Sequence, residues 1–180
     1  MNGLRRFAVV AMMVAVVLPT LIGCGPSRER MGRYTYVVSA DPGIPGEIEV
    51  DVVGVNEAGG LEWDAMDVNK YFLPGTPRRA NEIKKTLTLS QGNRVATLSK
   101  TDPIWNEWLG ENASRNDGGI GARSVYFVAR MAQPVSATSR DTRLLSVPLS
   151  QRRWNNGQEI NITLSGSGLG LASSMKPVEE

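Results

Sequence analysis

Apolar and polar residues alternate along several short segments of this chain. In segments 47–55 and 158–164, every second residue through most of the segment is Ile, Val or Leu, and the residues between are mostly polar. A period of two indicates half-buried β-strands. Further strands are predicted over 33–39, 84–90, 94–99, 123–130 and 143–149. The positions expected to be buried are Ile48, Val50, Leu87, Leu89, Val125, Phe127, Ile160 and Ile162.

The residues between and within these segments refine the prediction. Gln91-Gly92-Asn93 supplies turn residues between segments 84–90 and 94–99, which predicts a β-hairpin. Segment 123–130 is apolar on both faces at its centre, as a central strand would be. Segment 143–149 contains Pro148, which lacks the N–H needed for a ladder and so suits an edge strand or a strand end.

One or two short helices are predicted among the strands. Asp102 can cap a helix, Pro103 suits its first position and Gly110 can end it. The apolar face of this helix would comprise Ile104, Trp105, Trp108 and Leu109. Segment 61–72 has weaker helical spacing.

Six or seven short strands with one or two short helices predict a mainly β protein, an antiparallel β-sandwich over residues 33–165. The alternative is an open antiparallel sheet with helices on one face. Residues 166–180 are rich in Gly and Ser, so we expect a flexible C-terminal tail that frays.

The first 23 residues have the pattern of a secretory signal peptide, with two arginines followed by the apolar stretch 7–22. Leu21-Ile22-Gly23-Cys24 resembles the bacterial lipobox, so we expect Cys24 to begin the mature chain and carry the lipid. A transmembrane helix is the alternative, but the stretch is shorter than the roughly 20 residues needed and Pro19 interrupts it. Residues 24–32 then form a lipidated tether. In enteric bacteria, an aspartate directly after the acylated cysteine retains a lipoprotein in the inner membrane. This chain has Gly25 at that position, which favours the periplasmic face of the outer membrane.

Composition narrows the classes of function. The chain has 20 Lys and Arg and 18 Asp and Glu, and because residues 1–23 hold two arginines and no acid, the mature part is neutral. No basic surface for nucleic acid is therefore expected. The chain has no histidine, which excludes histidine triads and histidine-ligated metals. Its one cysteine, Cys24, is expected to be acylated, which excludes thiol catalysis as well. We expect no cofactor and no metal. Glu47, Glu49 and Asp51 share one strand face, which we expect to be solvated.

Three stretches of the chain resemble the TssJ family, the outer-membrane lipoproteins of type VI secretion. Residues 48–55 are similar to the first long strand of the family. Residues 63–72 lie where the family has an aromatic-containing helix, and residues 125–130 with 143–149 and 160–166 are similar to its closing strands. Region 83–121 adds a hairpin and a Trp-rich helix to that pattern.

The resemblance implies a transthyretin-like β-sandwich without enzymatic activity. It also implies a docking role, in which the acylated Cys24 holds the membrane and the domain binds the periplasmic part of a TssM-like inner-membrane protein. The candidate contact is the loop after the first long strand, with Glu57, Gly59, Gly60 and Leu61 as its binding residues. Two adjacent glycines and a position between strands suit a binding loop, although the same residues also suit a plain connector.

Two other classes of function remain open from the sequence. One is a cell-envelope lipoprotein that binds glycan or another ligand on exposed tryptophans. Trp154, which lies beside the turn residues Asn155-Asn156-Gly157, is the tryptophan expected to be most exposed. The other is a carboxylate-dependent enzyme such as a glycosidase, which needs two acids that converge in a cleft.

Overall fold

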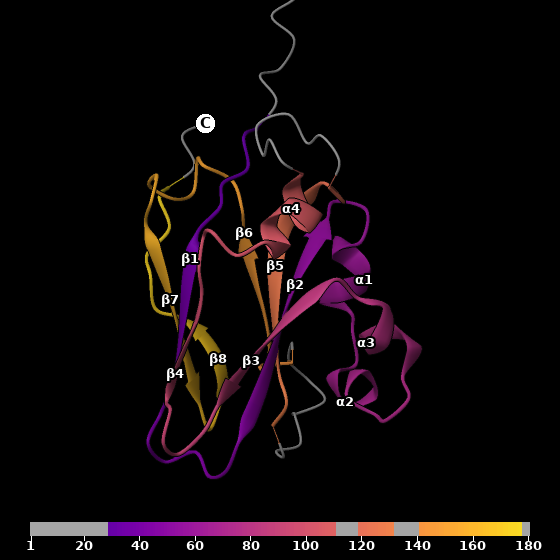
Figure 1. Ribbon diagram of the computed structural model, residues 1–180, viewed down its shortest axis with the longest axis vertical. Helices are drawn as coiled ribbons and strands as arrows, with labels where there is room; N and C mark the ends of the chain where they lie inside the picture. The colour runs from indigo at the N-terminus through magenta and orange to yellow at the C-terminus, as the bar shows by residue number, and fades with distance from the viewer. Residues whose placement is uncertain (1–28, 111–118, 132–140, 178–180) are drawn as a thin grey trace, which may run out of the picture.

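Two four-stranded sheets face each other in the computed structural model, which describes residues 29–110, 119–131 and 141–177 (Figure 1). The first sheet has the order β4-β1-β7-β8 and the second the order β3-β2-β5-β6. The first comprises β1 (Thr35–Ala40), β4 (Val95–Leu98), β7 (Glu159–Ser165) and β8 (Gly168–Leu171). The second comprises β2 (Ile48–Asn56), β3 (Lys84–Leu89), β5 (Ala122–Ala129) and β6 (Leu144–Pro148). The prediction of a mainly β sandwich is confirmed.

The main apolar core lies between the sheets. All eight positions expected to be buried are buried in it, because the alternating residues of β2, β3, β5 and β7 point to the facing sheet. β5 lies between β2 and β6, as expected of a central strand, and β6 is an edge strand that ends at Pro148.

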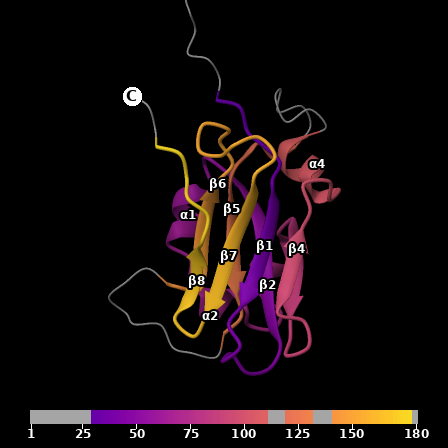
Figure 2. The ribbon, with the colours of Figure 1, turned by 90° about the vertical axis from the view of Figure 1, so that its left-hand side faces the viewer.

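The N-terminal strand β1 is central in its sheet. It pairs with β4 in the antiparallel sense and with β7 in the parallel sense, from Thr35 opposite Glu159 to Ala40 opposite Leu164. The sandwich is therefore antiparallel except for this pair. In Figure 2, β1 and β7 lie side by side with β4 and β8 at the two edges.

The hairpin predicted from residues 84–99 is wrong. Ser90 and Asn93 do exchange two backbone hydrogen bonds, of 2.9 and 3.2 Å, around the expected turn. Beyond the turn, however, β3 pairs with β2 in one sheet and β4 pairs with β1 in the other. The turn therefore carries the chain across the sandwich, because each strand finds a longer partner in a different sheet.

The helix expected after Asp102 is present as α4 (Ile104–Leu109), which closes one end of the sandwich. The Ile104 N–H donates to the Asp102 carboxylate at 3.0 Å, and Gly110 ends the helix with a φ of 78°. Trp105 and Trp108 are fully buried in the main core. Trp108 packs directly on the backbone of β2 at Gly54, where a Cβ atom would lie 2.4 Å from its ring.

Three more short helices cover the outer face of the second sheet: α1 (Gly60–Asp64), α2 (Val68–Tyr71) and α3 (Pro77–Asn81). We call them the helical layer. A second apolar cluster lies beneath it, in which the Trp63 ring contacts the rings of Tyr71 and Tyr126, together with the outer valines of β2 and β5. The weak spacing in 61–72 thus marks two helices, and α3 was not predicted.

Two further expectations need correction. Trp154 is only 1% exposed, because its ring packs edge-on against Tyr34 and its Nε1 donates to the Pro148 carbonyl at 2.7 Å. The expected fraying from residue 166 is also wrong in part, since β8 pairs with β7 and extends the sheet to Leu171. No helix in the described residues is long and apolar enough to span a bilayer. The proposed signal peptide and Cys24 lie outside the described residues.

Candidate partner-binding surface

The four residues proposed to bind a partner lie where β2 leads into α1, with Glu57 and Gly59 in the connecting turn and Gly60 and Leu61 at the start of the helix. The Asn56 side-chain oxygen accepts from the Gly59 N–H at 2.9 Å, and the Gly60 N–H donates to the Glu57 carbonyl at 3.3 Å. Glu57 is exposed, and Leu61 is 84% exposed, the highest value among the large apolar residues that the structure describes. The structure therefore brings these residues together on the surface.

The glycines of this turn have a different role from the one expected. Gly59 has φ −79° and ψ −14°, a conformation open to any residue. Its special feature is close packing, because a Cβ atom there would lie 3.1 Å from a methyl group of Val55. The turn therefore lies tight against the end of β2.

The helix that carries Leu61 is held firmly at several points. Trp63 is buried on its inner side, and the Arg78 guanidinium lies 4.8 Å above the Trp63 ring and 2.9 Å from the Glu62 carboxylate. The Tyr126 hydroxyl lies 3.3 Å from the Gly60 carbonyl and 3.1 Å from the Asp64 carboxylate. Leu61 is thus an exposed apolar side chain on a rigid support, which is the arrangement that favours a binding anchor.

A buried carboxylate on β2 ties the helical layer to the sheet. Asp51 is fully buried and accepts from Arg79 Nε at 2.7 Å, from the Thr86 hydroxyl at 2.6 Å and from the Tyr71 hydroxyl at 3.2 Å. Arg79 also reaches Glu49 at 3.0 Å. The expectation that this strand face is solvated is therefore wrong at Asp51, because the helical layer covers it.

The ionisation of this cluster follows from its contacts. Burial by itself raises the pKa of Asp51, but the hydrogen bonds from Arg79 and Thr86, the charge of Arg79 and the Tyr71 hydroxyl outweigh it, so the pKa lies below its ordinary value. Burial and the Asp51 charge raise the pKa of Tyr71. Asp51 is therefore a carboxylate that holds structure.

A second link joins α2 to β6. The Arg143 side chain is buried and binds both carboxylate oxygens of Asp141, at 3.0 and 2.8 Å, and the side-chain oxygen of Asn69 at 2.9 Å. Together with Asp51 and Arg79, this contact fixes the helical layer at both edges of β5.

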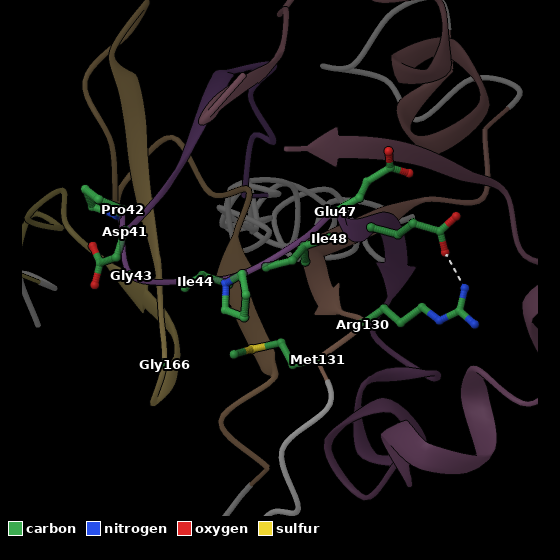
Figure 3. Close-up of a pocket in the computed structure, with 11 residues that line it drawn as sticks. Asp41, Pro42, Gly43, Ile44, Glu47, Ile48, Arg130, Met131 and Gly166 are labelled. Carbon is green, nitrogen blue, oxygen red and sulfur yellow. Dashed lines mark hydrogen bonds and ion pairs between the residues drawn. The ribbon is translucent and has the colours of Figure 1, made fainter. Parts of the chain in front are cut away.

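A hollow of about 880 Å³ opens at the end of the sandwich opposite α4 (Figure 3). Ile44, Ile48 and Met131 give it an apolar floor, while Arg130, paired with Glu49 at 3.2 Å, lies at its rim. In the described residues, no group of three His, Cys, Asp or Glu side chains is placed to hold a metal ion.

The glycan-binding alternative depended on exposed tryptophans, and the structure does not have them. All four tryptophans of the chain are buried, with exposures of 4% or less, so none offers a stacking face for a sugar ring. Three of them donate to backbone carbonyls: Trp154 as described above, Trp105 to Ser99 and Trp108 to Ile83, the last two at 2.9 Å.

Comparisons with known proteins found a likeness in fold. No protein-family model and no curated protein matches the sequence. Among solved structures, the chain is similar to one of the T6SS protein TssM C-terminal domain from EAEC, with 14% identity and a TM-score of 0.50, over 77% of this chain and 98% of that one.

Two lipoprotein structures have lower TM-scores. Serratia marcescens Lip, a membrane-bound component of the type VI secretion system, gives 0.49 with 16% identity, over 78% of this chain and 96% of that one. The T6SS lipoprotein TssJ1 from Pseudomonas aeruginosa gives 0.44 with 14% identity, over 83% and 99%. At these identities the likeness concerns the fold alone. The described chain thus shares its sandwich fold with a type VI secretion structure.

Proposed function

We propose that this chain is a lipid-anchored structural subunit of a type VI secretion membrane complex. The observation that carries the proposal is the sandwich fold, which is similar to that in the TssM C-terminal domain structure along nearly the whole of that chain. The lipobox at Cys24 and the strand patterns that resemble the TssJ family agree with it. The protein would sit on the periplasmic face of the outer membrane and act as a link rather than as an enzyme.

The anchor is the acylated Cys24. One acyl chain binds a membrane only marginally, whereas the several chains of a mature bacterial lipoprotein bind stably. Cys24→Ser should therefore give a precursor that is neither acylated nor retained in the outer membrane. Fatty-acid labelling with detergent partitioning tests this, and equal labelling of the variant and the wild type would refute it.

The partner site is the turn that carries Glu57, Gly59, Gly60 and Leu61, and the partner is the periplasmic domain of a TssM-like protein. An exposed leucine on a rigid helix can enter a pocket of a partner without a large loss of conformational entropy. Beside it, Glu57 can supply a charged contact at the rim.

The test replaces Glu57 with Ala and Leu61 with Ser together. Affinity for the partner domain should fall about tenfold or more, which corresponds to about 1.4 kcal/mol, while the melting temperature stays unchanged because both side chains are exposed. The matched control is Glu47→Ala with Leu73→Ser, which removes an exposed Glu and a 58% exposed Leu away from the turn. Equal affinity of both double variants and the wild type would exclude the turn from the interface.

A further inference from the structure

The described chain begins at one end of the sandwich and is fixed there at once. The Glu29 carbonyl accepts from Arg123 Nη1 at 3.4 Å, and its carboxylate bonds the Ser150 hydroxyl. Arg30 and Gly32 then make backbone bonds to Gln151 and Leu149, at 2.9 and 2.8 Å. From Glu29 onward, the chain is therefore bonded to the rest of the domain.

Four residues lie between Cys24 and Glu29, so five Cα–Cα steps join the two. Fully extended chain covers at most about 3.6 Å per residue, so this end of the sandwich lies within about 18 Å of the acylated residue. We call it the N-terminal end. Figures 1 and 2 show that α4 and the β2–α1 turn lie at the same end, while the turns after β1 and β3 lie at the other.

A hollow of about 510 Å³ opens at the N-terminal end. It is lined by Glu29, Met31, Glu57, Arg123, Ser124, Pro148, Ser150 and Arg153. Arg153 Nη2 contacts the Met175 sulfur at 3.4 Å, and its buried Nε has no hydrogen-bond acceptor among the described residues. Arg123 and Arg153 both line the hollow, and guanidinium groups suit an anion with several oxygen acceptors.

The lining of this hollow is balanced in charge, with Arg123 and Arg153 against Glu29 and Glu57, and further basic residues lie beside it. Arg30 and Arg152 are next in sequence to the lining residues Glu29 and Arg153, and the backbone N–H of Lys176 donates to the Arg153 carbonyl at 2.9 Å. The acids nearby are Glu29, Glu57 and Glu159. On the α4 side of this end, Arg33 and Lys100 are matched by Asp102 and Glu107. Among the described residues in and beside the hollow, five basic side chains thus accompany three acidic ones.

We propose that the N-terminal end of the sandwich is a membrane-facing surface, on which Arg30, Arg123 and Arg153 bind the phosphates of anionic lipid headgroups. This inference rests on the acyl anchor of the proposed function, which brings the surface to the bilayer. Headgroup phosphates supply both the negative charge and the acceptors, and attraction between basic side chains and an anionic leaflet acts within about a Debye length, about 8 Å at physiological ionic strength. The bound headgroups orient the domain with its N-terminal end toward the bilayer.

The test uses the acylated protein purified from membranes and reconstituted in vesicles. A fluorophore is placed on Asn156→Cys, in an exposed turn at the N-terminal end, or on Gln91→Cys, in an exposed turn at the opposite end. Acylation occupies Cys24, so each variant carries one reactive thiol. Quenching by lipid with a nitroxide on the headgroup then reports which end faces the bilayer. The vesicles combine phosphatidylethanolamine with either phosphatidylglycerol or phosphatidylcholine.

In phosphatidylglycerol vesicles, we expect quenching to be several-fold stronger at position 156 than at position 91. Phosphatidylcholine vesicles should reduce this difference, and so should Arg30→Glu with Arg123→Glu. The matched control, Lys70→Glu with Arg130→Glu, reverses two exposed charges away from this end. This variant should retain the difference in quenching between positions 156 and 91.

Two results would overturn the inference in different ways. Equal quenching at both positions in firmly anchored protein would refute the membrane-facing surface and leave the anchor intact. Failure of the protein to float with either type of vesicle would refute the acyl anchor and this inference with it. Melting temperatures of the two double variants show whether a loss of quenching reflects unfolding.

Discussion

The Arg79 guanidinium on α3 lies 2.7 Å from the Asp51 carboxylate on β2, and this buried ion pair fastens the helical layer to the sheet. The carboxylate is fully buried, whereas the Arg79 side chain is 25% exposed. Leu61, the apolar residue of the proposed interface, lies on this same layer. The pair therefore supports the position of a residue that it does not contact.

Arg79→Ala should lower the free energy of unfolding by about 3 kcal/mol. Removing one member of a buried pair leaves the other charge without compensation, at a cost of about 3–5 kcal/mol, and partial exposure of Arg79 favours the lower value. Urea denaturation measures the change. Lys70→Ala breaks an exposed pair with Asp67 at 3.7 Å and should change stability by less than about 0.5 kcal/mol. Similar costs for both variants would contradict the structural role of Asp51.

The pH dependence of stability should depend on Asp51. Its pKa is lower in the folded protein than in the unfolded chain, where it is about 3.9, so the unfolded state takes up the proton first as pH falls. The stabilisation is complete well above pH 4 and is lost below it, as pH falls toward the folded-state pKa. Denaturation between pH 7 and pH 3 should show a steeper loss for the wild type than for Asp51→Asn. Parallel curves would refute this assignment.

Two tyrosine variants should change stability in opposite directions. The Tyr36 hydroxyl is fully buried and has no hydrogen-bond partner among the described residues, while its ring contacts Trp105 and Phe127. Tyr36→Phe keeps the ring and removes an unsatisfied group, so stability should rise by about 1 kcal/mol. Tyr71→Phe removes the bond to Asp51 at 3.2 Å and should cost about 1.5 kcal/mol or more. Thermal unfolding of both variants gives the comparison.

Gly54→Ala should displace α4. The added Cβ would lie 2.4 Å from the Trp108 ring, so the helix or the strand must move, at a cost of about 1–3 kcal/mol. Near-ultraviolet circular dichroism, which is sensitive to the packing of Trp105 and Trp108, should change as well. Gly43→Ala is the control, since nothing lies within 4 Å of its Cβ position. An unaltered spectrum for Gly54→Ala would contradict the packing.

The strands of the core could be predicted because their pattern is local. The side chains that point inward follow directly from the alternation of apolar and polar residues in β2 and β7 and from the apolar run of β5. Which strands pair is not local, and so the turn at Gln91-Gly92 predicted a hairpin where the chain crosses to the other sheet.

The helical layer could not be predicted in full for a related reason. Its helices have four or five residues each, too few for a period of 3.6 to show. Asp51 did carry a signal, since an acid between Val50 and Val52 on a strand buried on both faces needs a partner. The partner, Arg79, lies 28 positions away and no local pattern identifies it. Trp154 was misjudged because its neighbours in sequence are polar, whereas its neighbour in space is Tyr34.

The central place of β1 has a mechanical consequence. A pull on the chain ahead of Glu29 is transmitted along β1, which is bonded to β4 on one side and to β7 on the other. The backbone hydrogen bonds of β1 lie perpendicular to the direction of the pull. They are therefore loaded in shear and at the same time, and they do not open one after another as they would from a free edge. Forced unfolding depends on the barrier to that first rupture. A domain attached through this strand would therefore transmit tension between the proposed anchor and a partner bound to its surface.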